Sequence, residues 1–214
     1  MINKEKLWLI PISDLESGRD FVSDQDFKSM EILSNWVLEY LCTPHPSLGR
    51  AGPVCPFTRQ SIEKGKFWIA TISNAQFESD EIVELIDGYR DLFLELPSKD
   101  LMDKTIILAL PGLNGETCGP KVDDLQKKLK PHFVNQGLMI GQFYSSCMES
   151  GLWNEQFHPL QSPIPLLAIR HMVPSDFPFL VGTRGNSQML IDYFSRFAPN
   201  LPKNIRMQIS KLLS

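Results

Sequence analysis

The feature that most constrains the fold is a continuous apolar segment at residues 105–110, TIILAL, which Pro111 and Gly112 bring to an end. A strand with one solvated face would alternate apolar and polar residues, so this run is typical of a strand buried on both faces. Such a strand lies inside a sheet whose faces are covered by other elements. The sequence therefore predicts a central strand here, with helices packed around it.

Periodic apolar residues predict further elements on both sides of this strand. Ser23 or Asp24 can cap the first helix, Ser79 can cap the second, and Gly137 ends the third. The expected helices span 21–41, 80–96, 122–133, 186–197 and 202–213, and the other strands span 66–73, 138–144 and 165–172, with one more strand at 7–12 inside an extended arm.

This order of elements predicts one α/β or α+β domain with a four- or five-stranded mixed sheet covered by helices. We expect the last two strands to pair antiparallel, because no helix separates them. Residues 1–20 form the N-terminal arm in this interpretation, and residues 21–214 form the single domain.

Charge and composition exclude several classes of protein. Lys and Arg total 21 against 25 Asp and Glu, so the net charge of −4 argues against a nucleic-acid binder, which needs a basic excess. The apolar segment 7–12 is too short for a secretory signal, and no run is long enough to span a membrane. The four cysteines are therefore expected to be reduced thiols in a cytoplasmic protein.

A loop rich in proline and glycine, residues 43–57 (TPHPSLGRAGPVCPF), holds the first group of candidate functional residues. Prolines fix φ and glycines allow close approach, so the loop can hold His45, Arg50 and Cys55 in a set geometry. A Cys55 thiolate followed by Pro56 can ligate haem iron, and Arg50 can pair with a haem propionate or a substrate carboxylate. The alternative is a buried structural cysteine beside a proline turn.

A zinc site is the less favoured alternative. Cys42 and His45 have Cys-x-x-His spacing, and Cys55 follows ten residues after His45. A structural zinc needs a fourth ligand, which Cys118, Cys147 or His158 would have to supply, although none of these has a recognised pair spacing.

The segment 137–180 holds the second group of candidates. Arg170 and His171 lie near the end of an apolar strand, where ligand sites of open α/β sheets occur, and alternation sends them to opposite faces. Arg170 either pairs with Asp176 in a structural role or points into a pocket that also holds Cys55. Cys147 and His158 are a weaker candidate for a thiol–imidazole pair.

Three segments carry a resemblance to known families: HPSLGRAGPVCPF at 45–57, GLMIGQFY at 137–144 and PLLAIRHMVPSDFPFL at 165–180. Together they resemble an uncharacterised bacterial family, a domain of unknown function found beside natural-product biosynthesis genes, over about residues 36–197. A weaker similarity, in layout only, links the chain to the small haem proteins of the YqcI/YcgG type, some of which N-hydroxylate guanidino groups.

These observations lead to two functional hypotheses. The first is a haem-thiolate oxidative enzyme acting on a small metabolite, with N-oxygenation in specialised metabolism as its reaction. In it Cys55 ligates the metal, His45 and Arg50 flank the cofactor, and Arg170 and His171 are the catalytic polar groups. It involves a small-molecule substrate and a redox partner, with a homodimer as an open alternative. The second hypothesis is a non-catalytic ligand-binding or protein-interaction module without haem.

Overall fold

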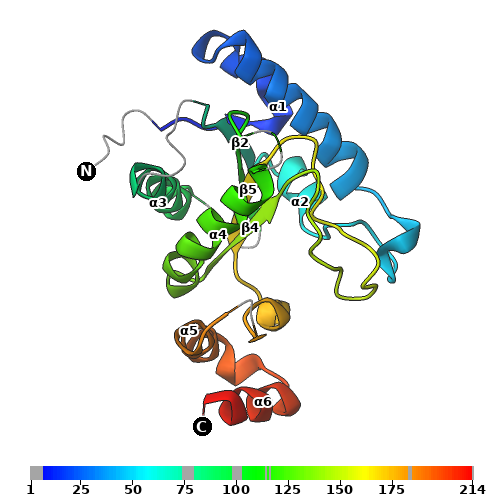
Figure 1. Ribbon diagram of the computed structural model, residues 1–214, viewed down its shortest axis with the longest axis vertical. Coiled ribbons are helices and arrows are strands. Elements are labelled where there is room, and N and C mark those ends of the chain that lie inside the picture. Colours follow the sequence, from blue (N-terminus) through cyan, green and yellow to red (C-terminus); the bar gives the residue numbers. More distant parts are fainter. Residues whose placement is uncertain are drawn as a thin grey trace.

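The computed structural model describes residues 7–73, 80–97, 103–113, 115, 117–182 and 185–213. At its centre is a five-stranded sheet with the order β1-β2-β3-β5-β4 (Figure 1). β2 and β3 run parallel, and the other neighbouring pairs run antiparallel. The strands are β1 (Ile10–Pro11), β2 (Phe67–Thr71), β3 (Thr105–Ala109), β4 (Leu138–Phe143) and β5 (Leu166–His171). The predicted class, an α+β fold with a mixed sheet, is confirmed.

Alternate side chains of β3 divide the core between the two faces of the sheet. Ile106 and Leu108 pack with α3 (Asp80–Glu95) and α4 (Cys118–Asn135) on the first face. Ile107 and Ala109 pack on the second face with α1 (Asp24–Trp36) and the π-helical turn Val37–Leu41 that continues it. Figure 1 shows α3 and α4 on one side of the sheet and α1 and α2 (Thr58–Glu63) on the other. The central apolar strand is thus buried on both faces, as predicted.

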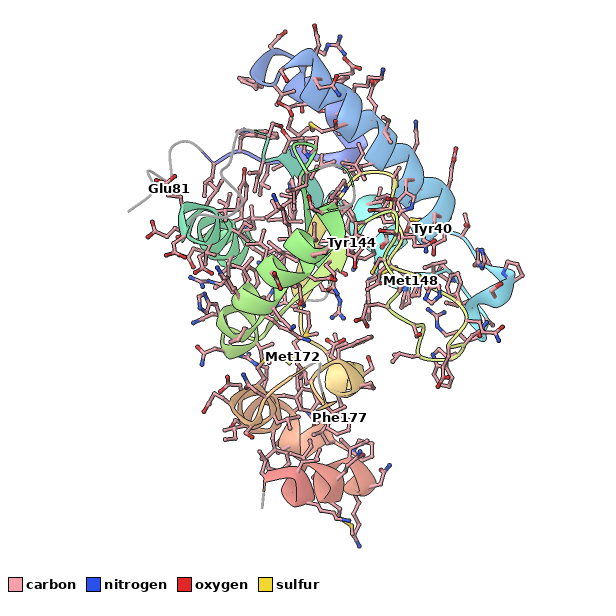
Figure 2. The ribbon with its side chains drawn as sticks, viewed as in Figure 1. Tyr40, Glu81, Tyr144, Met148, Met172 and Phe177 are labelled. Atoms are coloured by element: carbon pink, nitrogen blue, oxygen red, sulfur yellow. The ribbon has the colours of Figure 1, made fainter. Side chains whose placement is uncertain are left out.

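The C-terminal helices form a separate apolar cluster beyond one end of the sheet. α5 (Ser187–Phe197) and α6 (Lys203–Leu213) pack there with the 3-10 helix Pro174–Phe179. Figure 2 shows Met172 and Phe177 where this cluster joins the rest of the fold. The cluster fixes the chain that follows β5, and with it the position of Asp176, which becomes important below.

The N-terminal prediction is wrong in its details. The strand expected at 7–12 is reduced to Ile10–Pro11, and a 3-10 helix, Ile12–Phe21, follows where we expected an extended arm. Ser17 Oγ donates to the carbonyl of Asp14 at 2.7 Å, a local bond of the kind by which polar residues favour turns over strands. Residues 1–6 lie outside the described part of the chain.

The start of the first long helix also differs from the prediction. The first long helix begins at Asp24 instead of Phe21, because Ser23 caps it by accepting a hydrogen bond from Asp26 N at 3.1 Å. The proposed cap at Ser79 lies outside the described residues. Gly137 follows α4 with φ of 76°, as its predicted role at the helix end requires.

Candidate functional site

The proline loop, residues 43–57, is braced by its own backbone. Pro44 and Pro53 form an antiparallel bridge, and Val54 N donates to the carbonyl of Thr43 at 2.9 Å. The Arg50 guanidinium donates to the carbonyls of Ala51 and Val54, each at 3.0 Å. Arg50 is thus held by carbonyls of the loop itself, and its pairing with a haem propionate or a substrate carboxylate stays a prediction.

A second loop, residues 145–163, packs against the proline loop. Asn154 Nδ2 donates to the carbonyl of Ser47 at 2.9 Å. Gly49, with φ of 77°, approaches so closely that a Cβ there would lie 2.8 Å from the carbonyl oxygen of Trp153. These contacts join two segments that are about a hundred residues apart in the sequence.

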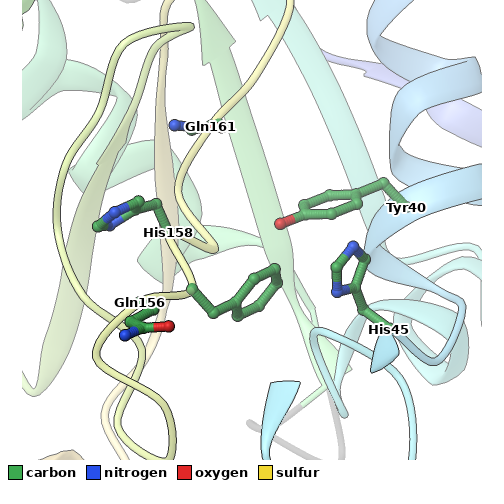
Figure 3. Close-up of a pocket in the computed structure, with 6 residues that line it drawn as sticks. Tyr40, His45, Gln156, His158 and Gln161 are labelled. Carbon is green, nitrogen blue, oxygen red and sulfur yellow. The ribbon is translucent and has the colours of Figure 1, made fainter. Parts of the chain in front are cut away.

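A cleft of about 310 Å³ opens between the two loops. Figure 3 shows Tyr40 and His45 on one wall and Gln156, His158 and Gln161 on the other. The cleft is lined by Tyr40, His45, Gln156, Phe157, His158 and Gln161. Its volume is at the lower end of the range for small-molecule sites, and in the part of the chain that the structure describes, none of its lining side chains is an Asp, Glu, Lys or Arg.

Aromatic rings continue from this cleft to the edge of the sheet. His45 stacks on Phe157 with ring centres 4.6 Å apart, and Tyr40 meets His45 edge-on at 6.1 Å. Trp36 stacks on Tyr40 at 5.7 Å and meets Phe143 of β4 edge-on at 5.8 Å. The cleft therefore has a flat aromatic wall whose orientation is fixed by the end of α1 and by the sheet.

Polar groups in the cleft have unused hydrogen-bonding capacity. Nδ1 of His158 is buried and has no hydrogen-bond partner among the described residues. Tyr40 donates to the carbonyl of Pro159 only at 3.4 Å, and the amide of Gln161 donates to the carbonyl of Cys147 at 3.3 Å. A buried polar atom without a partner is costly, so His158 is the group for which a bound molecule would be most favourable.

Arg170 lies on the second face of the sheet and makes a bidentate ion pair. Its guanidinium donates to both oxygens of Asp176, at 2.8 and 2.5 Å, and stands over the ring of Phe57 at 5.5 Å. Burial alone would lower the pKa of Arg170, but the hydrogen bonds and charge of Asp176 raise it, with a further contribution from Cys55. Arg170 thus has its structural partner and also lies close to Cys55.

His171 points to the opposite face, as alternation along β5 requires. Its ring packs on Phe93 at 5.0 Å, and its Nε2 is buried with no hydrogen-bond partner among the described residues. Burial, with smaller contributions from the charges of Lys104 and Arg196, lowers the pKa of His171 to about 4. His171 and Arg170 therefore do not share one site, which separates the two residues that the haem hypothesis combined.

The remaining candidate ligands are also divided between the two faces. Cys42 and Cys55 lie near each other on the second face, whereas Cys147 is buried on the first face beside Tyr144. Burial raises the pKa of Cys147, which is unfavourable for a nucleophile. In the part of the chain that the structure describes, no three or more His, Cys, Asp or Glu side chains are grouped to hold a metal ion. The four-ligand zinc set is not assembled there, and zinc binding stays a prediction.

Comparison with known proteins identifies the family. The model of a domain of unknown function, DUF6875, matches residues 30–208, which is most of the chain. The chain belongs to this family. No curated protein and no solved structure matches it significantly. The DUF6875 match covers the proline loop, the second loop and β5, so every candidate site residue named above lies inside the domain. Among the described residues of this DUF6875 protein, no helix is long and apolar enough to cross a membrane.

Sequence reasoning identified His45 but missed most of the cleft. Tyr40 has the spacing of a core residue on a helix, so its place in the cleft gave no separate signal. Gln156, Phe157 and Gln161 belong to no motif, and only the packing of the two loops places them beside His45. The two histidines of the cleft, His45 and His158, were the only part of the set visible from residue type.

Proposed function

We propose that this DUF6875 protein binds a small, uncharged, planar molecule in the cleft between the proline loop and the second loop. The observation that carries the proposal is the buried Nδ1 of His158, which has no partner among the described residues and belongs to the lining of the cleft. This nitrogen has almost no solvent-accessible surface, so the His158 ring would turn toward the cleft on binding, and a ligand atom bonded to Nδ1 would then remove the cost of burying it unpaired.

The lining side chains define the chemistry of the ligand. The stacked rings of His45 and Phe157 offer an aromatic surface, which favours a flat ring system. Gln156, Gln161 and Tyr40 supply amide and hydroxyl groups that both donate and accept hydrogen bonds. None of the described residues that line the cleft is an Asp, Glu, Lys or Arg, so a charged ligand would lose its hydration without gaining a partner of opposite charge. A neutral heteroaromatic compound satisfies all of these conditions.

A ligand panel tests this proposal. The full chain is screened by ligand-observed NMR and thermal shift against nicotinamide, uracil and indole, each paired with a charged counterpart: nicotinate, orotate and indole-3-carboxylate. We expect binding within the neutral set and at least tenfold weaker binding of the charged partner, a difference of about 1.4 kcal/mol.

Two histidine variants show whether the binding occurs in the cleft. His158→Phe keeps a ring of similar size and removes Nδ1, so it should weaken binding about tenfold or more. His132→Phe is the matched control, because His132 is exposed on α4, where its Nδ1 contacts Asp87 at 2.9 Å. Equal binding by His158→Phe and wild type, or absence of binding by every neutral compound, would refute the proposal.

Haem binding at Cys55 is the second candidate, favoured by one specific observation. Cys55 is partly exposed near the end of a braced loop, so its sulfur can be approached from solvent by a metal-bearing cofactor. Haem held by a thiolate would supply oxidative chemistry that depends on electrons from a redox partner. Hemin is added to the full chain, and the ferrous–CO spectrum is recorded for wild type and Cys55→Ser. A Soret band at the thiolate-ligated position that Cys55→Ser abolishes supports this candidate, and an unchanged spectrum removes it.

A further inference from the structure

The backbone hydrogen bonds at the base of the proline loop bring two cysteines, Cys42 and Cys55, close together. The bridge joins Pro44 to Pro53, and Val54 N donates to the carbonyl of Thr43 in the next pair outward. Beyond that pair the regular pairing ends, because Cys42 closes the preceding helix with helical φ of −86°, and Cys55 N donates to the carbonyl of Leu41 at 2.9 Å. A residue hydrogen-bonded to the peptide group that precedes Cys42 has its Cα roughly 5–7 Å from the Cα of Cys42, which overlaps the range that disulfides span.

The environments of the two sulfurs differ in a way that suits stepwise oxidation. Cys42 is 3% exposed, whereas Cys55 is only partly buried and reaches solvent. Burial raises the pKa of Cys42, Arg59 lowers it, and Cys55 raises it, so the two thiols are close enough to interact. Arg59 also donates to the carbonyl of Cys42 at 2.9 Å, which holds that end of the loop in place.

We propose that Cys42 and Cys55 form a disulfide when a hydroperoxide reaches Cys55, closing the proline loop with an oxidation-sensitive bond. The O–O bond of the peroxide breaks as Cys55 sulfur takes one oxygen, which gives a sulfenic acid and releases water or an alcohol. Cys42 sulfur then attacks Cys55 sulfur, the S–S bond forms, and the sulfenic oxygen leaves as a second water with the Cys42 proton. The peroxide is reduced, and the two thiols are oxidised.

The Cys42–Cys55 disulfide would close a covalent loop that contains His45 and Gly49. Cross-linking a loop of this length removes freedom from the unfolded chain, so the oxidised protein should melt roughly 5–10 °C above the reduced one. Thiol reductants should reverse the change by thiol–disulfide exchange. Reversible disulfides of this kind are typical of redox-sensing proteins.

Tryptic mapping tests the bond directly. Cleavage after Lys28, Arg50 and Arg59 places Cys42 in peptide 29–50 and Cys55 in peptide 51–59, so the two peptides stay joined only if the disulfide exists. The full chain is treated with hydrogen peroxide, alkylated, digested without reductant and analysed by mass spectrometry. We expect the joined peptide in wild type and its loss in Cys55→Ser.

Control variants define the outcomes. Cys118→Ser and Cys147→Ser should form the joined peptide as wild type does, because these cysteines lie in the other core cluster or against it. Cys42→Ala should stop oxidation of Cys55 at the sulfenic acid, which dimedone traps. A Cys55 that becomes sulfinic acid in wild type without joining Cys42, or that joins another cysteine, would overturn the proposal. The mapping needs no ligand or haem, so its result is independent of the proposed binding function.

Discussion

Removing the guanidinium of Arg170 should destabilise the protein strongly. Arg170 donates two hydrogen bonds to Asp176, and a third to the carbonyl of His171 at 2.8 Å. Asp176 is 2% exposed and would keep only its bond from Val173 N, at 2.8 Å. The Arg170→Ala variant therefore leaves a buried carboxylate without its charged partner.

The expected size follows from these contacts. Hydrogen bonds to charged groups contribute about 1.5–3 kcal/mol each, and breaking a buried pair costs about 3–5 kcal/mol. The Arg170 side chain is 26% exposed, so water can enter and replace part of what is lost. We expect about 3 kcal/mol for Arg170→Ala, which corresponds to a fall in Tm of roughly 6–12 °C for a chain of this size.

Urea unfolding at neutral pH measures this loss, and a double-mutant cycle assigns it to the pair. Arg170→Lys keeps the charge but loses the bidentate geometry, so its loss should be intermediate. Arg170→Met combined with Asp176→Leu removes both charges and should recover part of the stability that either single change loses. A loss below about 1 kcal/mol for Arg170→Ala, or strict additivity in the cycle, would show that the pair does not stabilise the fold as argued.

Two further predictions concern His171 and Gly49. The pKa of His171 is 6.5 in the unfolded chain and about 4 in the fold, so the unfolded state binds the proton first as the pH falls. The contribution of His171 to stability should therefore be full above pH 6.5. It should fall by up to about 3 kcal/mol as the pH drops towards 4. We expect the free energy of unfolding, measured with urea at each pH, to change less with pH in His171→Phe than in wild type. An equal dependence on pH in the two proteins would contradict the assignment to His171. Gly49→Ala should lower Tm by about 2–8 °C, since it adds left-handed strain and a clash with Trp153. Gly65→Ala, with φ of 64° and no atom within 4 Å, is its control, and equal losses in the two variants would show that the loop contact contributes nothing.

The parts of the fold that sequence predicted are those with strong local patterns. The apolar run 105–110 identified β3, and periodic apolar residues identified α3 and α4. α2 gave no such signal, because it is six residues long and the residues it buries include the polar Thr58 and Ser61. The insertion of β5 between β3 and β4 also leaves no local trace, since pairing depends on which strands meet in three dimensions.

In the candidate site too, the sequence predicted what depends on a local pattern and missed what depends on contacts between distant segments. Alternation along β5 correctly placed Arg170 and His171 on opposite faces, and Asp176 was correctly named as the possible partner of Arg170. The bonds of Arg50 within its own loop were not predicted, because only the folded loop shows which carbonyls lie within reach of the guanidinium. The cleft depends on contacts between distant loops, which a single sequence does not encode as a pattern.

The position of β5 has a consequence for how the chain folds as it is synthesised. β3 and β4 leave the ribosome before β5, yet each pairs with β5 and they do not pair with each other. Until residues 166–171 emerge, one edge of the apolar β3 has no partner, and β4 has no neighbouring strand on which to form. Unpaired apolar strand edges attract other chains, so nascent chains halted before β5 should aggregate or require a chaperone, whereas chains that include it complete the sheet in one late step.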